Sequence, residues 1–217
     1  MPSPEPAPLV IAVDGPSAAG KGTLARRLAA HYGLRHLDTG SLYRATALRV
    51  LRSGGDPEKE AEAAAAANGI TDDDLDDPAL RNEDVGQAAS VVGTHGGVRR
   101  ALLDYQRAFA ARPPGAVLDG RDIGTVVCPD AQVKFYLEAT THVRAARRLC
   151  ELRSRGVESI ESRVLEEIIT RDARDRRRSA APMKPAADAC RIDTSALGPD
   201  EVFERAVAIV DARLSSV

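Results

Sequence analysis

Short apolar runs alternate along this chain with longer stretches whose apolar residues recur every three or four positions. The short runs, at residues 9–13, 35–37, 116–119, 133–137 and 190–193, are typical of buried strands. The longer stretches predict helices, at residues 21–32, 41–52, 83–92, 98–112, 141–155, 161–178 and 199–214. Because strands and helices alternate, the sequence predicts an α/β fold, a parallel sheet flanked by helices on both faces.

The stretch between residues 56 and 78 has a weaker pattern. Asp56-Pro57-Glu58 is typical of a helix start, with a capping side chain, a proline in the first turn and an acid near the positive helix end. This helix would run to Asn68. The acidic residues 71–77 lack the spacing of an EF-hand loop and are expected to form a solvated loop. We expect a disordered tail over residues 1–8 and a single domain over residues 9–217.

Composition and charge narrow the class of protein. The 217 residues carry a net charge of −2, so no overall charge favours a nucleic-acid polymer or a membrane surface. No apolar run approaches the ~20 residues that a membrane-spanning helix requires. The three cysteines and four histidines are scattered without the spacing of a metal site, and such thiols favour a reducing compartment. We therefore expect a cytoplasmic protein.

The first predicted strand leads into a glycine-bounded loop that ends where the first predicted helix begins. A strand, the spacing Gly-x-x-x-x-Gly-Lys and a helix together are typical of a phosphate-binding loop. Glycines let backbone N–H groups approach an anion, the helix start adds its positive dipole end, and Lys21 adds a full charge. The predicted ATP-binding residues are Gly15, Pro16, Ser17, Ala18, Ala19, Gly20, Lys21, Gly22 and Thr23. The general motif has Ser or Thr directly after the lysine, whereas here Gly22 intervenes before Thr23.

Charged residues gather beyond the predicted strand ends and on one late helix. Ligands of such sheets bind beyond the carboxyl ends of the strands, where residues 38–40 and 119–122 are polar. Four charged residues share one face of the helix 161–178 by their spacing, namely Arg171, Arg174, Asp175 and Arg178. Spacing alone favours a solvated helix end as much as a phosphate-binding face. The adjoining apolar face places this stripe near the protein body, and phosphoryl transfer requires positioned positive charge.

Five segments match a known family in the family's own order. They are residues 14–23, residues 37–44, residues 98–99 with 106–109, residues 119–127 and residues 171–176, and the most specific is Asp119-Gly120-Arg121-Asp122-Ile123-Gly124-Thr125-Val126-Val127. In these segments the chain resembles the bacterial cytidylate kinases, members of the nucleoside monophosphate kinase family of P-loop kinases. The resemblance spans nearly the whole chain, and Gly22 is the usual residue of that family.

The resemblance implies a role for each matching residue. It implies that Arg44, Arg121 and Arg178 hold the acceptor phosphate, that Tyr43, Arg171 and Asp175 lie around the ribose, and that Ser90, Arg99 and Asp122 face the cytosine. Thr39 is expected in the same CMP-binding site. Cytosine offers an amino donor beside two acceptors, so a carboxylate with an arginine complements it, whereas uracil reverses part of this pattern.

The resemblance also implies two smaller regions, an acceptor-binding region at about residues 39–97 and a lid at about residues 152–170. In that reading, Arg148, Arg174 and Arg176 are the candidates to reach the transferring phosphate from the lid side. The expected catalytic residues are Lys21, Arg121, Arg148, Arg174 and Arg178. The family's larger insert before Ser90 is replaced here by the short acidic stretch at residues 71–77.

The expected activity is transfer of the γ-phosphoryl group of ATP to CMP or dCMP, with Mg²⁺ as cofactor and Thr23 as an indirect magnesium ligand. The expected partners are ATP, CMP and dCMP, without a nucleic-acid polymer or a membrane, and the chain is expected to be a monomer. Two alternatives stay open. The acceptor could be UMP, AMP or shikimate, or the chain could be a non-catalytic nucleotide-binding switch module.

Overall fold

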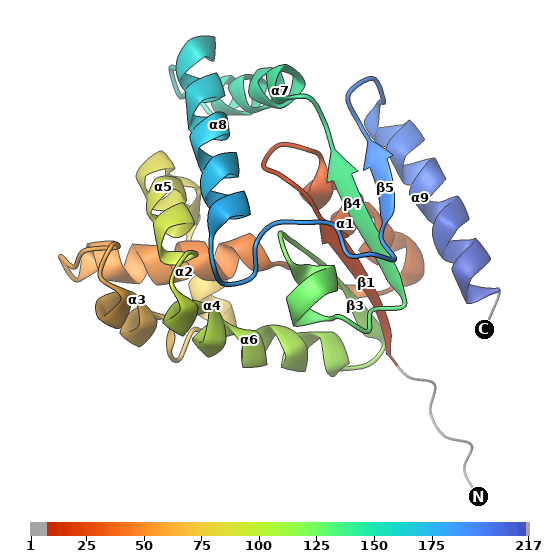
Figure 1. Ribbon diagram of the computed structural model, residues 1–217, viewed down its shortest axis with the longest axis horizontal. Helices are drawn as coiled ribbons and strands as arrows, with labels where there is room; N and C mark the ends of the chain where they lie inside the picture. The colour runs from red at the N-terminus through yellow and green to blue at the C-terminus, as the bar shows by residue number, and fades with distance from the viewer. Residues whose placement is uncertain (1–7, 216–217) are drawn as a thin grey trace, which may run out of the picture.

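A single parallel sheet organises the structure, a computed structural model that describes residues 8–215. The strand order is β2-β3-β1-β4-β5, and each neighbouring pair is parallel. Strands β1, β4 and β5 can be followed in Figure 1. The strands are β1 (Leu9–Asp14), β2 (Arg35–Asp38), β3 (Gly115–Gly120), β4 (Val133–Glu138) and β5 (Cys190–Asp193). The predicted α/β fold is confirmed.

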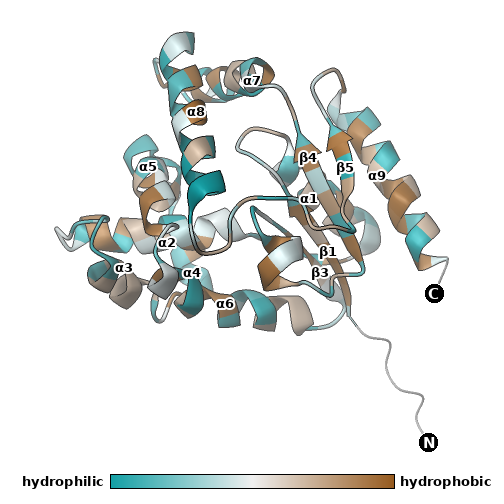
Figure 2. Cartoon of the chain, viewed as in Figure 1, coloured by the Kyte–Doolittle hydropathy of each residue, from teal (hydrophilic) through white to brown (hydrophobic). Residues whose placement is uncertain are grey.

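Helices cover both faces of the sheet. They are α1 (Lys21–Tyr32), α2 (Thr39–Arg52), α3 (Glu60–Ala67), α4 (Asp72–Leu75), α5 (Glu83–Val92), α6 (Gly96–Ala111), α7 (Thr141–Ser154), α8 (Glu161–Arg177) and α9 (Pro199–Leu214). Strand residues alternate between two apolar cores: Ile11 and Val13 pack toward α1 and α9, whereas Ala12 packs toward α2, α5 and α6. In Figure 2 the apolar strands contrast with the strongly hydrophilic last turns of α8.

The carboxyl ends of the strands meet at one edge of the sheet, because all the strands run in the same direction. In the pairing register, Asp14 of β1 lies opposite Gly120 of β3, and Asp38 of β2 lies opposite Asp119 of β3. The glycine-bounded loop, residues 15–20, follows β1 at this edge, and Arg121 follows β3. Segments separated by about a hundred residues in the sequence are thereby adjacent in space.

The structure corrects two expectations between residues 56 and 81. The third helix begins at Glu60 and not at Asp56, because the Asp56 carboxylate accepts the N–H of Glu58 within a separate turn. The expected acidic loop contains the short helix α4, and a 3₁₀ turn, Pro78–Arg81, follows it. Asp74 makes this order possible, since its side chain accepts from Thr71 and pairs with Arg49 of α2 at 2.8 Å.

Helices α7 and α8 form a hairpin with an apolar core of its own, at the top of Figure 1. The core residues are Ala145, Leu149, Leu152, Val164 and Ile168. The expected lid lies within this hairpin, and its boundaries stay a prediction. Among residues 8–215, no helix is long and apolar enough to cross a membrane. The expected tail falls almost wholly on residues 1–7, which lie outside the described part of the chain.

Candidate active site

The loop after β1 is shaped by its two glycines and closed by its lysine. Gly15 has φ 142°, and a Cβ there would stand 2.2 Å from the carbonyl oxygen of Leu137 in β4. Gly20 has φ 94° directly before α1, a conformation that other residues rarely adopt. Lys21 is 6% exposed, and its ammonium donates to the carbonyl of Pro16 at 2.8 Å. The loop therefore combines backbone groups that are suited to bind an anion with a buried lysine that bonds the loop itself.

A cavity of about 340 Å³ opens on one side of this loop. Its lining combines the loop and α1 with α7 and the segment from residue 194 to residue 202. The lining residues are Ala18, Ala19, Gly20, Thr23, Leu24, Arg147, Glu151, Thr194, Leu197, Pro199 and Val202. Thr194 fixes this wall, because its hydroxyl donates to the carbonyl of Ala19 at 3.1 Å and its own oxygens accept from Arg147. Sequence reasoning missed Arg147 and Thr194. The position of Thr194 just after a strand end was a signal that could have found it.

A second cavity lies among α2, α5, α6, α8 and the end of β3. Its lining residues are Thr39, Gly40, Tyr43, Ala89, Ser90, Gly93, Arg99, Gly120, Arg121, Asp122, Arg171, Asp175 and Arg178. The structure thus brings together nine of the ten predicted acceptor-site residues, leaving out Arg44, which donates to the carbonyl of Leu80 at 3.0 Å. The free space is about 50 Å³, since the charged side chains close on one another.

Two carboxylates, those of Asp122 and Asp175, pair with the arginines of this second cavity. Asp122 pairs with Arg99 and with Arg178, the latter at 3.3 Å. Asp175 accepts from Nε of Arg121 at 3.1 Å. Although burial opposes ionisation, the surrounding arginines hold the pKa of Asp175 below its usual value. Both aspartates are buried, so each holds its arginines in place in the absence of a ligand.

One end of the cavity carries positive charge without matching acceptors. Nε of Arg171 is buried and has no hydrogen-bond partner. Burial, followed by the repulsion of Arg121, lowers the pKa of Arg171 to about 10 and that of Lys21 to about 7. Burial likewise lowers the pKa of Arg44, and Arg121 and Arg148 add to this effect. An orphaned donor among mutually repelling cations is suited to bind a multiply charged anion.

The three predicted lid-side arginines do not line either cavity. Arg176 pairs with Asp172 of its own helix at 3.6 Å, whereas the other two bridge the hairpin to α5. Arg148 of α7 pairs with Glu83 of α5 at 2.7 Å, and also with Glu151. Arg174 of α8 donates to the hydroxyl of Ser90 at 2.7 Å. Their predicted contact with a transferring phosphate stays a prediction.

A fully buried ion pair, which sequence reasoning missed, ties the hairpin to the loop. Arg144 of α7 is 2% exposed and pairs with Asp172 of α8 at 2.6 Å. The same guanidinium donates to the carbonyl of Ser17 in the loop at 3.2 Å. No local sequence pattern indicated this contact, because it joins residues that are 127 positions apart.

The residues beside α1 fit a magnesium ion that arrives with a nucleotide. Among the described residues, no group of three or more His, Cys, Asp or Glu side chains could hold a metal alone. Asp38 and Asp119 are register partners, and an oxygen of Asp119 lies 3.8 Å from where a Cβ on Gly22 would stand. Desolvation and the carboxylate of Asp119 raise the pKa of Asp38. Mg²⁺ is commonly held by one or two such carboxylates together with substrate phosphates and waters.

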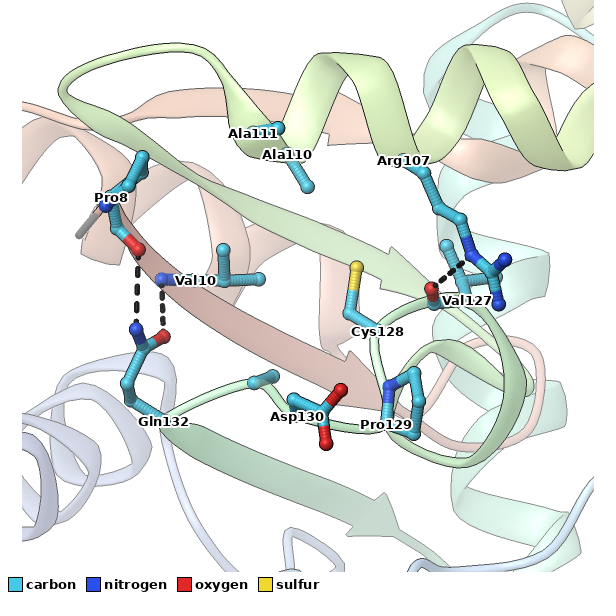
Figure 3. A pocket seen from close by; sticks show the side chains of 11 residues that line it. Pro8, Val10, Arg107, Ala110, Ala111, Val127, Cys128, Pro129, Asp130 and Gln132 are labelled. Atoms are coloured by element: carbon cyan, nitrogen blue, oxygen red, sulfur yellow. Dashed lines mark hydrogen bonds between the residues drawn. The ribbon is translucent and has the colours of Figure 1, made fainter.

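A further cavity of about 500 Å³ lies at the opposite end of β1 from the loop (Figure 3). Its polar groups satisfy one another. Arg107 donates to the carbonyl oxygens of Val126 and Val127, and the Gln132 amide bonds the backbone of Pro8 and Val10. It lacks the converging charges of the two cavities beside the loop.

Comparisons with known proteins agree with this geometry. The family model described as Cytidylate kinase matches residues 11–212. A cytidylate kinase from Rhodopseudomonas palustris (strain TIE-1) is 54% identical over 204 residues, which cover 94% of this chain and 96% of the relative. One from Nitrobacter winogradskyi is 55% identical over the same shares.

Solved structures share the fold at much lower identity. A gluconokinase from Sinorhizobium meliloti 1021 superposes with a TM-score of 0.53 at 17% identity, covering 96% of this chain and 94% of its own. An uncharacterized protein from Eubacterium ventriosum has a TM-score of 0.52 at 13% identity, covering 94% and 98%.

Proposed function

The chain belongs to the cytidylate kinase family, and from that premise we propose that it transfers the γ-phosphoryl group of ATP to CMP or dCMP. The products are ADP and CDP or dCDP. The observation that carries this proposal is the pair of cavities, one lined by the loop and the other by arginines and aspartates, with the charge of Arg121 in the second acting on Lys21 of the loop. A non-catalytic nucleotide switch has no use for the second, charge-lined cavity.

We assign the larger cavity to ATP. Its apolar wall, Leu197, Pro199 and Val202, suits a purine, and the loop amides suit the phosphates. Lys21 is the residue that reaches toward the β- and γ-phosphates. When phosphate oxygens replace the Pro16 carbonyl as its partner, the ammonium gains negative charge that offsets its burial and the repulsion of Arg121.

We assign the charge-lined cavity to CMP, with its phosphate directed toward Arg171, Arg121 and Arg44. This orientation follows the unmatched positive charge at that end. The cytosine then lies toward Asp122 and Arg99. The assignment changes one implied role, since Arg178 pairs with Asp122 and therefore belongs to the base end of the site.

The reaction requires no covalent enzyme intermediate. A phosphate oxygen of CMP attacks the γ-phosphorus of ATP, a new P–O bond forms, and the bond to the β-phosphate oxygen breaks so that ADP leaves. Charge develops on the transferred group and on both flanking oxygens. Lys21 is placed to stabilise the donor side, and Arg121 the acceptor side.

Mg²⁺ bound with ATP would neutralise phosphate charge, and Asp38 and Asp119 are the carboxylates placed to hold it. Thr23 lines the ATP cavity, so we keep it as an indirect contact through water. The hairpin α7–α8 would close over both substrates and exclude water as a competing acceptor. Arg148 and Arg174, which contact α5 from this hairpin, would then be near the transferred group.

A coupled ADP-release assay with a panel of acceptors tests the proposed function. We expect turnover with CMP and dCMP, at least tenfold lower kcat/KM with UMP, AMP and shikimate, and little ADP without an acceptor. Faster turnover of AMP or shikimate than of CMP would contradict the acceptor assignment. ATP binding without phosphorylation of any acceptor would instead support the switch module.

A further inference from the structure

Asp14, the last residue of β1, lies directly before the phosphate-binding loop and is 3% exposed. Its two carboxylate oxygens are both engaged. One accepts the backbone N–H of Ile123 at 2.8 Å, and the other accepts that of Gly124 at 2.7 Å. A single side chain at the start of the ATP loop therefore holds two amides of a segment 109 residues away in the sequence.

The two amides open a five-residue π-helical turn, Ile123–Val127. The first amides of a helical turn have no partner within it and require an outside acceptor. The later amides of Val126 and Val127 do bond within the turn, to the carbonyl of Asp122. A carboxylate is the one side chain of this length that offers two acceptor oxygens and no donor.

The turn that Asp14 holds also carries the acceptor residues. Arg121 and Asp122 directly precede it, and the Asp122 side chain holds Arg99 and Arg178. The Lys134 side chain also packs against Gly124, since a Cβ there would meet it at 3.1 Å. The position of the turn thus sets where the acceptor charges stand relative to the ATP loop.

Keeping a carboxylate here is unfavourable by itself. Burial, with the repulsion of Asp122, raises the pKa of Asp14 to about 6, against the opposing effect of the two amides and Lys21. A neutral side chain would avoid this cost but could not accept both hydrogen bonds.

We propose that Asp14 is a positioning residue, which holds Arg121 and Asp122 at the correct distance from the ATP loop for phosphoryl transfer. The inference rests on the proposed function but concerns a residue that touches neither substrate. Any effect of Asp14 on the reaction must therefore act through Arg121 and Asp122. It must change the kinetic parameters for the acceptor more than those for ATP.

Asp14→Asn is the direct test, because asparagine keeps the shape but turns one acceptor into a donor that faces a backbone N–H. We expect kcat/KM for CMP to fall about 10- to 100-fold, the usual loss when a reacting group shifts by about 1 Å. The KM for CMP should rise and kcat should fall, whereas the KM for ATP should change less than twofold. Val210→Ala in the α1–α9 core is the control, and it should lower Tm without changing either KM.

A double-mutant cycle separates positioning from general damage. In an Arg121→Ala background, adding Asp14→Asn should cost less than about threefold in kcat/KM. Full additivity, or an unchanged KM for CMP in Asp14→Asn, would overturn the proposal. Asp14→Ser, which is smaller and also loses the paired acceptors, gives the same readout if Asp14→Asn does not fold. Wild-type turnover of CMP tests the proposed function separately, so failure of one proposal is distinguishable from failure of the other.

Discussion

The donor and acceptor halves of the site are built in different ways. The proposed donor half centres on one contiguous loop, residues 15–23, which contributes backbone groups and one lysine. The acceptor half is assembled from α2, α5, α6, α8 and the end of β3, and its groups are arginine and aspartate side chains paired with one another. Backbone amides hold any phosphate chain, whereas side chains on several elements can be matched to one acceptor. The difference indicates that acceptor choice resides in the side-chain half.

The two halves also differ in their state without a ligand. The donor cavity has about 340 Å³ of free space, whereas the acceptor cavity has about 50 Å³ because its ion pairs fill it. In the proposed assignment, CMP must therefore replace contacts that the protein makes to itself. This exchange helps to discriminate between acceptors, since a ligand that matches the freed groups poorly leaves buried charges unpaired.

The sharpest test of this division is Arg121→Ala, for which we expect the largest effect. The charge of Arg121 acts on Lys21, and we propose that transition-state charge develops between these two residues. Its loss should lower kcat/KM for CMP by about 10² to 10³-fold while leaving ATP binding within about threefold. Steady-state kinetics and calorimetric ATP titration check this.

Arg191→Ala is the matched control, because Arg191 is an exposed arginine whose ion pair with Glu138 lies on the surface. It should retain wild-type kinetics. If Arg121→Ala instead weakened ATP binding as strongly as turnover, the two halves would not be separable in function.

The difference between a contiguous loop and a site assembled from several elements also explains which features the sequence could predict. The loop was found from local spacing, and the parallel sheet from the alternation of apolar runs, since both signals lie within a few neighbouring residues. The acceptor arginines on α8 were found by helical spacing, which could not tell a solvated face from a binding face. Their grouping with Arg99 and Asp122 came only from the resemblance to a family.

The contacts that sequence reasoning missed join distant segments. Asp14 bonds residues of another strand end, and Arg144 bonds the loop from 127 residues away. Thr194 reaches Ala19 across 175 residues. Each depends on the strand order, which no local pattern contains. The false helix start at Asp56 arose differently, because a side chain that can cap a helix can cap a turn equally well.

Asp122→Asn tests whether the acceptor half determines the base. Asparagine keeps the size of the side chain but offers an amino group where the carboxylate accepted, which suits the acceptor that uracil presents in place of the cytosine amino group. We expect the ratio of kcat/KM for CMP to that for UMP to fall about tenfold. Competition assays with both nucleotides measure it.

Asp188→Asn, which alters a carboxylate outside the site, should keep the wild-type ratio. An unchanged CMP-to-UMP ratio in Asp122→Asn would place base selection elsewhere in the cavity.

The smallest effect concerns the donor half, and it follows from the pKa of Lys21. In the free protein burial lowers this pKa to about 7, so part of the population is neutral near physiological pH. Bound phosphates favour the ammonium and raise the pKa, so binding takes up a proton. Affinity for magnesium-free ADP should therefore fall as pH rises, by about fivefold between pH 7 and 8, as expected for one proton at such a site. Calorimetry in buffers of different ionisation enthalpy should show this proton uptake directly.

In Lys21→Arg the guanidinium stays charged throughout, and the pH dependence should disappear even where the affinity itself is lower. CMP binding, which we assign to a cavity without Lys21, should stay nearly level over the same interval. A pH-independent ADP affinity in the wild type would mean that Lys21 is already fully charged in the free loop, and that the donor half, like the acceptor half, is electrostatically prepared before its ligand arrives.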